Sequence, residues 1–154
     1  MIIIVYDLLI ILILLIISYI DIKKKIIPDS ILIIGVLITI LNFILNGSKF
    51  SMNNIAGFIF GFILFLIIAL LTDAMGGGDI KLMALLGLNF GLKGTIFIMF
   101  FSFVIGALIS LVLIGFKIKK KTDNIAFAPF ISLSTFIYML YGNQLINFYI
   151  NLFS

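Results

Sequence analysis

The sequence contains no cysteine, histidine, tryptophan, arginine or glutamate. Without cysteine, the chain has no disulfide bond, no cysteine metal cluster and no thiol nucleophile. Without histidine, it forms neither a serine–histidine–aspartate triad nor a zinc site of the H-E-x-x-H kind. All six acidic residues are aspartates and all ten basic residues are lysines. If the protein is an enzyme, its acid–base groups are therefore aspartate, lysine or tyrosine.

Charged residues of either sign are also scarce. They make up 10% of the 154 residues, whereas apolar residues make up 64%. A soluble globular domain is closer to half apolar and a quarter charged, so we interpret the sequence as an integral membrane protein. The net charge of +4 does not indicate nucleic-acid binding, because the lysines lie between apolar runs, where they set membrane orientation.

Apolar runs predict the membrane-spanning helices. They cover residues Ile2–Ile20, Ser30–Leu45, Ile55–Leu71, Ile80–Leu92, Thr95–Phe116 and Ile125–Tyr141. The first run follows no lysine and precedes no small-residue cleavage site, so we interpret it as a retained helix rather than a signal peptide. The predicted fold class is an all-α integral membrane bundle of about six transmembrane helices, the fourth short. A possible interfacial helix over Leu145–Phe153 completes a single transmembrane domain, residues 1–154.

The fourth run is short for a span, but the lysines favour its crossing. With six crossings and the N-terminus outside, eight lysines lie inside and two, Lys49 and Lys93, lie outside. The inner lysines are then Lys23, Lys24, Lys25, Lys81, Lys117, Lys119, Lys120 and Lys121. If the fourth run does not cross, the split is five against five. The preference of lysine for cytoplasmic loops therefore supports six crossings.

Asp21 and Asp79 are the candidate catalytic residues. Two crossings separate them, so they lie on the same side of the membrane, which the lysines make cytoplasmic. Two neighbouring carboxylates at low dielectric share a proton, so that one deprotonates a water and the other protonates a peptide carbonyl or leaving amine. This is aspartic protease chemistry, and it requires neither a cofactor nor a metal ion. The alternative is that both acids cap helices or meet lipid headgroups.

The other four acids have different interpretations. Asp29 follows Pro28 and precedes a span, as an N-cap or first-turn acid does. Asp7 lies on the opposite side from the pair, and we expect it to be structural. Asp73 is on the same side as the pair and is the strongest rival for a catalytic role. Asp123 follows the last lysine cluster, and we expect it to be solvated.

The glycines Gly76, Gly77 and Gly78 directly precede Asp79. Their backbone freedom would let Asp79 dip inward and let an extended substrate backbone approach; the alternative is a flexible loop without that role. A phosphate-binding loop is not indicated, because no G-K-[ST] follows. Lys81 either biases the nearby aspartate towards ionisation or extends to lipid headgroups.

Small residues at four-residue spacing allow helix backbones to approach each other. The third run has this spacing at Gly57 and Gly61, and the fifth at Ser102, Gly106 and Ser110. Each pattern is either a contact inside the bundle or a chance match in a glycine-rich chain.

Three stretches together carry a resemblance to a known family. Asp21–Asp29 has an aspartate followed seven residues later by proline in an I-P-D turn. Gly76–Ala84 reads G-G-G-D-I-K-L-M-A, and Ile125–Phe130 reads I-A-F-A-P-F. In this order and spacing they resemble the type IV prepilin peptidase family, membrane aspartic proteases of the GxGD type. The G-x-G-D-x-K-L match is the most specific of the three, and the likeness covers nearly the whole chain.

The resemblance implies that Asp21 and Asp79 are the catalytic pair. It implies substrate-binding or loop-shaping roles for Gly76, Gly78, Lys81, Pro28 and Pro129. The implied substrates are type IV prepilin-like or pseudopilin precursors, cut at the cytoplasmic face after a short basic leader and before the hydrophobic segment. The implied location is the bacterial or archaeal cell (inner) membrane, in type IV pilus assembly or protein secretion.

The sequence departs from the family pattern in two ways. Ala126 stands where the family usually has proline, which should alter the local stiffness of the backbone. Many bacterial members also carry a cysteine-containing N-terminal portion linked to N-methylation of the cleaved substrate. Here the first apolar run begins at Ile2 and no cysteine exists. We therefore expect peptidase activity without methyltransferase activity, as in the short members of the family.

Two other functions stay open. Glycine-rich broken helices also occur at the sites of transporters, so residues 72–92 fit a small ion- or proton-coupled transporter or channel. Transporters usually show internal repeats, which are not apparent here, and carry their acids nearer the membrane midplane. The second alternative is a non-catalytic relative that binds prepilins without cutting them.

Overall fold

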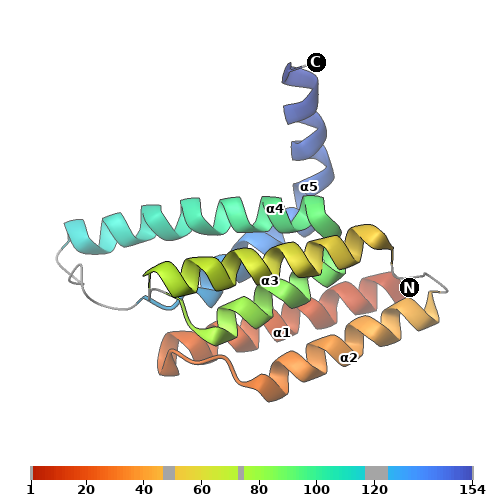
Figure 1. The fold of residues 1–154 in the computed structure, drawn as a ribbon, viewed down its shortest axis with the longest axis horizontal. Helices are drawn as coiled ribbons and strands as arrows, with labels where there is room; N and C mark the ends of the chain where they lie inside the picture. The colour runs from red at the N-terminus through yellow and green to blue at the C-terminus, as the bar shows by residue number, and fades with distance from the viewer. Residues whose placement is uncertain (1, 47–50, 73–74, 117–124, 154) are drawn as a thin grey trace.

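The computed structural model describes residues 2–46, 51–72, 75–116 and 125–153. These residues form five helices and no strand: α1 (Ile2–Lys24), α2 (Asp29–Leu45), α3 (Met52–Thr72), α4 (Gly77–Gly115) and α5 (Ala128–Phe153). Helices α1 to α4 and the first part of α5 pack together as a bundle, and the C-terminal part of α5 projects away from it (Figure 1). The fold is thus all-helical, as the sequence predicts.

The helices are apolar on their outer surfaces as well as inside. Leu70 and Leu71, at the end of α3, are 75% and 78% exposed. The segments Val5–Lys24, Met52–Thr72 and Gly77–Gly115 are long and apolar enough to cross a membrane, and Asp29–Leu45 and Ala128–Gly142 are shorter apolar helices. A helix satisfies its own backbone hydrogen bonds, which makes it suited to lipid. The protein is therefore a multi-pass membrane protein.

The predicted count of six spanning helices is not confirmed. Helix α4 replaces the fourth and fifth predicted spans and has non-helical backbone at Gly91, with φ 67°. The chain reverses within α4, so its two parts run back along each other (Figure 1). Glycine suits this point because a Cβ there would be strained and would collide with the Asn53 amide. The expected separate helix over 145–153 is also not formed, because these residues continue α5.

Asparagines of α3 bind backbone groups that the break in α4 leaves without helical partners. The Leu92 N–H donates to Asn53 Oδ1 at 3.2 Å, and Asn54 Nδ2 donates to the Leu88 carbonyl at 2.8 Å. Backbone groups freed inside a membrane need such partners. The two asparagines therefore fix where the first part of α4 ends and the second part begins.

Glycines let α3 and α4 pack backbone against backbone. A Cβ added to Gly57 would lie 2.5 Å from the carbonyl oxygen of Gly87, and one added to Gly61 would lie 3.0 Å from that of Met83. The four-residue glycine spacing in α3 is thus a contact inside the bundle. In the second part of α4, a Cβ on Gly106 would lie 3.0 Å from the Phe130 ring of α5.

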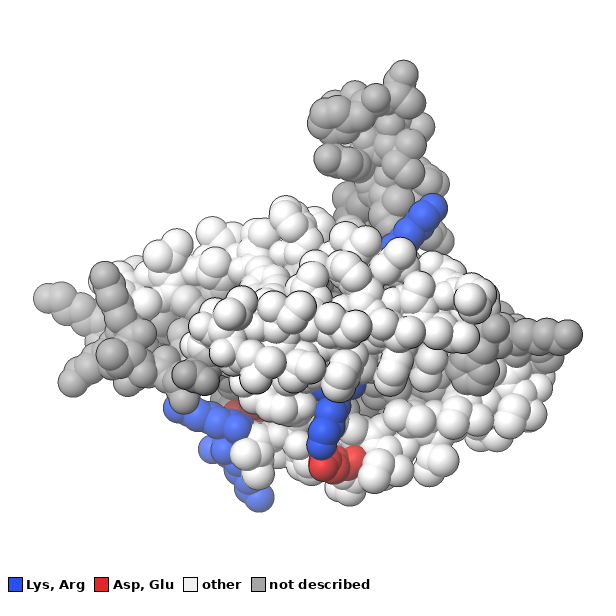
Figure 2. All heavy atoms as spheres, in the orientation of Figure 1, with Lys and Arg blue, Asp and Glu red and all other residues white. Residues whose placement is uncertain are grey.

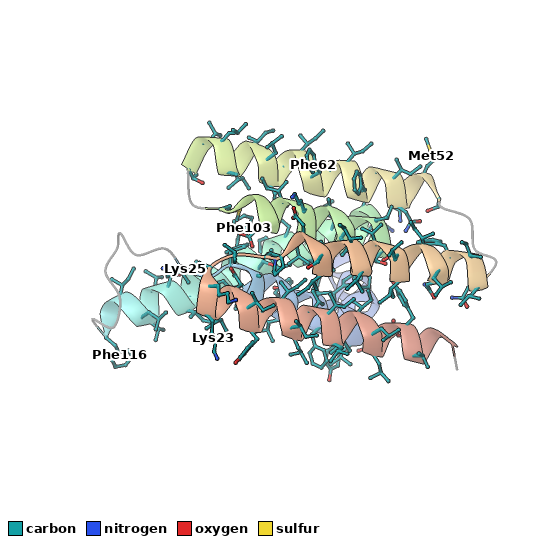
Figure 3. The ribbon with its side chains drawn as sticks, turned by 90° about the horizontal axis from the view of Figure 1, so that it is seen from below. Lys23, Lys25, Met52, Phe62, Phe103 and Phe116 are labelled. Carbon is teal, nitrogen blue, oxygen red and sulfur yellow. The ribbon has the colours of Figure 1, made fainter. Side chains whose placement is uncertain are left out.

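The core is formed mainly by α1, both parts of α4 and the first part of α5. Its most deeply buried apolar side chains include Ile17, Leu82, Met83, Leu86, Ile98 and Ile131. Rings of α3 and α4 also meet the ring that directly precedes α5, since Phe127 lies 6.2 Å from Phe65 and 5.4 Å from Phe103 between ring centres. Lys23, Lys25 and Phe116 mark one end of the bundle and Met52 marks the other (Figure 3). The candidate site lies at the end with the two lysines.

Candidate active site

Asp21 lies in the last turn of α1 and is held from α5. Its side chain is 5% exposed, and its Oδ2 accepts a hydrogen bond from the Ala128 backbone N–H at 3.0 Å. Ala128 is the first residue of α5, where backbone N–H groups have no partner within the helix. The start of α5 therefore supplies both a donor and a favourable dipole to the Asp21 carboxylate.

Asp79 lies in the first turn of α4 and is held by its own turn. It is 7% exposed, and its Oδ2 accepts a hydrogen bond from the Gly76 N–H at 3.2 Å. Gly76 is the N-cap of α4 and Asp79 is the third residue after it, so the aspartate plays the reciprocal part of a capping box. Its Oδ1 is buried and has no hydrogen-bond partner among the described residues. One oxygen of Asp79 is therefore free to bind a water or a substrate.

One cavity, of about 320 Å³, brings the two acids together. Its described lining residues are Asp21, Lys25, Ile26, Ile27, Met75, Gly76, Gly77, Gly78, Asp79, Ile125, Ala126 and Phe127. The carboxylates of Asp21 and Asp79 interact electrostatically. Apart from Lys25, the other lining residues are apolar or glycine. The cavity therefore presents two buried carboxylates to any group that enters it.

The glycine loop forms one wall of this cavity. Gly76 and Gly78 both line it. A Cβ added to Gly78 would lie 2.6 Å from the Cβ of Ile27, whereas one added to Gly77 would have no atom within 4 Å. The absence of a side chain at Gly78 therefore lets the start of α4 approach the segment that joins α1 to α2.

The predicted residue Lys81 lies outside the cavity. Its ammonium forms hydrogen bonds of 2.7 and 2.9 Å with the two oxygens of Asp29, and both side chains are exposed. Asp29 is the first residue of α2, as expected for a first-turn acid. Pro28 is the N-cap of α2, and Pro129 is the second residue of α5. These two prolines border the segments that line the cavity but do not line it themselves.

The other acids lie elsewhere or outside the described residues. Asp7 lines a second cavity of about 330 Å³ with Phe90, Tyr138 and Gln144, which α1 places at the opposite end of the bundle. Asp73 and Asp123 lie outside the described residues. No group of three acidic, histidine or cysteine residues that would hold a metal ion occurs in the described part of the chain.

Two participants of the site are missed by the sequence interpretation. The Ala128 N–H is a backbone group, and the only signal for it is the I-A-F-A-P-F stretch in which it lies. Lys25 enters the sequence interpretation only through the lysine count, although it lines the cavity. A lysine cluster at a span end gives no sign of which lysine lines the cavity.

The fold and the paired acids define a helical membrane protein that holds two buried carboxylates in one cavity at one end of its bundle. The profile of the type IV leader peptidase family matches residues 8–111, which is more than half of the chain, and the chain therefore belongs to this family. No solved structure matches.

Its relatives include several larger proteins. The prepilin leader peptidase/N-methyltransferase of Bacillus subtilis (strain 168) is 38% identical over 93 residues, 60% of this chain and 38% of that protein. The protein of the same name from Xanthomonas campestris pv. campestris is 26% identical over 139 residues, 86% of this chain and 48% of that protein. The chain thus spans about half the length of these relatives, or less.

Proposed function

We propose that this protein is a membrane aspartic endopeptidase that cuts the basic leader from type IV prepilin-like precursors. The observation that carries the proposal is that Asp21 and Asp79, from different helices, are both buried and face one cavity. Family membership and the names of the relatives support the choice of substrate. The family pattern G-x-G-D coincides with the residues that shape the cavity wall.

In the proposed mechanism, the two carboxylates share one proton. The ionised one takes a proton from a water, which attacks the carbon of the scissile peptide. The protonated one gives its proton to the peptide oxygen. The carboxyl that received the water proton then gives it to the departing amine, while the other carboxylate takes a proton back from a hydroxyl of the tetrahedral intermediate. Asp79 Oδ1 has no partner among the described residues, so it is available to the water or the peptide. The Ala128 N–H keeps Asp21 in a fixed orientation.

The proposal places this end of the bundle at the cytoplasmic face, with the N-terminus outside. Lys23 and Lys25 lie at the same end (Figure 3), and Lys81 follows Asp79 by two residues. Lys93 follows the break at Gly91 and lies at the opposite end. Lysines favour the cytoplasmic side, so a precursor would present its basic leader from the cytoplasm. The membrane is that of a bacterial or archaeal cell.

The proposal also restricts the reaction to peptide cleavage. The relatives are named leader peptidase/N-methyltransferase, whereas this chain has no cysteine. We therefore propose that it does not methylate its product. Incubation of purified protein with cleaved substrate and a methyl donor tests this point, and methylated product would contradict it.

Cleavage of a prepilin-like precursor in detergent or liposomes tests the catalytic pair. Asp21→Asn and Asp79→Asn should each lower the rate by a factor of about 10³ or more, because each acid has a separate role in proton transfer. Asp7→Asn, at the other end of the bundle, and Asp29→Asn, paired with Lys81, should stay active.

Three outcomes would contradict the proposal. Cleavage retained in both site variants would remove the protease mechanism and favour a binding or transport function. If Asp73→Asn is inactive and Asp79→Asn is active, Asp73 rather than Asp79 is the second catalytic acid. A wild-type protein that binds several precursors but cuts none would indicate a binding protein.

A further inference from the structure

Lys25 has an unusual backbone conformation. Its φ of 54° is the only positive φ of a non-glycine residue in the described part of the chain. Lys25 follows α1 directly, and its N–H donates to the Asp21 carbonyl at 2.8 Å, which is a left-handed helix C-cap. Glycine is usual there because a side chain is strained. Strained residues of this kind gather at functional sites, so the side chain of Lys25 calls for an explanation.

A role in helix capping does not explain this lysine. A positive charge near a helix C-terminus interacts favourably with the helix dipole, but Lys23 and Lys24 already provide one in the last turn of α1. The Lys23 ammonium lies 4.4 Å from the centre of the Tyr19 ring of the same helix. Neither of these two lysines lines the cavity, whereas Lys25 does.

Lys25 lies at the mouth of the cavity. Its side chain is exposed, whereas Asp21 and Asp79 are 5% and 7% exposed. In the described part of the chain, the only ion pair joins Lys81 to Asp29, so Lys25 is bound to neither carboxylate. The remaining described lining is apolar or glycine. Figure 2 shows lysine atoms beside acid atoms at this end of the bundle.

We propose that Lys25 selects the charge of the substrate residue that lies at the cavity mouth when the scissile bond is between Asp21 and Asp79. The inference rests on the proposed function and adds a specificity-determining residue to it. An ammonium repels lysine or arginine and attracts glutamate or aspartate. Because the leader is basic, this repulsion keeps its charged residues out of the mouth. Lys25 thereby limits which peptide bond of the precursor reaches the acids.

A set of precursor peptides tests the inference. Each carries alanine, glutamate or lysine at one position near the scissile bond, and binding is measured with the full chain carrying Asp79→Asn, so that cleavage does not interfere. At the peptide position that reaches the cavity mouth, we expect the peptide with glutamate to bind about fivefold more tightly than the peptide with lysine. This difference is the size of one partly solvated charge pair. Added salt should reduce the difference. Lys25→Glu should reverse the order, and the matched control Lys24→Glu should keep it.

Lys25→Gly separates charge selection from helix capping. Glycine adopts the left-handed conformation without strain, so this variant should unfold at the wild-type temperature or above while losing the charge preference. A wild-type preference that persists in Lys25→Glu at every position would overturn the inference. Cleavage by the protein with Asp79 intact is measured in parallel. If cleavage depends on Asp21 but the Lys25 variants leave charge preference unchanged, only the role of Lys25 fails.

Discussion

The Ala128 N–H donates a hydrogen bond of 3.0 Å to Oδ2 of Asp21. This bond joins the first residue of α5 to the last turn of α1, and both residues are buried. Hydrogen bonds to a charged group are stronger than neutral ones, so the start of α5 orients the carboxylate. Asp79, in contrast, takes its donor from Gly76 within its own turn.

Ala128→Pro should disable the site while α5 still forms. Proline has no N–H but is well accepted at the first position of a helix. Loss of the donor to Asp21 should reduce kcat/KM for precursor cleavage by about tenfold or more, the usual effect of removing a hydrogen bond to a charged group.

Two controls accompany this substitution. Ala128→Val adds volume at the same buried position but keeps the N–H, so it reports the cost of crowding alone. Ala126→Pro introduces the residue that the family usually has there, and we expect it to stay active. Equal losses for Ala128→Pro and Ala128→Val would show that the hydrogen bond to Asp21 is not important.

Gly78→Ala should destabilise the protein and Gly77→Ala should not. A Cβ at Gly78 would lie 2.6 Å from that of Ile27, but one at Gly77 would meet nothing within 4 Å. We expect a loss of about 1–3 kcal/mol at Gly78 from overpacking. At Gly77, alanine should be neutral or stabilise the helix by about 0.5–1 kcal/mol. Thermal unfolding in detergent measures both.

The sequence is a good guide to which acids meet but a poor guide to the groups that hold them. Charge placement and the count of crossings put Asp21 and Asp79 at one end of the bundle, and one cavity does bring them together. The hydrogen bond from Ala128 and the left-handed Lys25 were not predicted. Helices that are apolar on all sides have no polar face to indicate which residues turn inward. The hydropathy pattern therefore does not show which side chains of different helices contact each other.

The break within α4 shows a similar limit. The short fourth run predicts a chain reversal before Thr95, and Gly91 supplies it. Asn53 and Asn54, whose side chains bind backbone groups beside the break, lie at the start of α3. Nothing in the sequence around them indicates that they contact the region of Gly91. The two parts of α4 on either side of Gly91 correspond to the two runs expected over Ile80–Leu92 and Thr95–Phe116.

Lys81→Ala should reduce cleavage much less than Asp21→Asn or Asp79→Asn. The Lys81 ammonium binds the exposed Asp29 carboxylate, and exposed ion pairs contribute about 0.2–1 kcal/mol. A double-mutant cycle of Lys81→Ala and Asp29→Ala should give a coupling free energy in this range from thermal unfolding. A Lys81→Ala protein as inactive as Asp79→Asn would show that Lys81 acts on the acids rather than on Asp29.

Gly57→Ala should separate α3 from α4. The added Cβ would lie 2.5 Å from the Gly87 carbonyl oxygen and 2.6 Å from the Gly91 carbonyl carbon, and backbone atoms do not move aside as a flexible side chain would. We expect a loss of about 2 kcal/mol or more and a lower unfolding temperature. Gly115→Ala, where a Cβ meets nothing within 4 Å, is the matched control at the end of α4. Similar unfolding temperatures for both variants would argue against the close contact.

The partner of Asp21 lies 107 positions later in the chain, which has a consequence for biogenesis. Ribosomes make the N-terminus first, so α1 and its aspartate enter the membrane before α5 exists. Until then the carboxylate lacks its donor, and Phe127 has not closed its side of the cavity. We expect a ribosome-bound nascent chain that ends before α5 to contain both aspartates yet cut no precursor. The proposed peptidase would thus be inactive throughout its own synthesis and become active only when its last helix inserts.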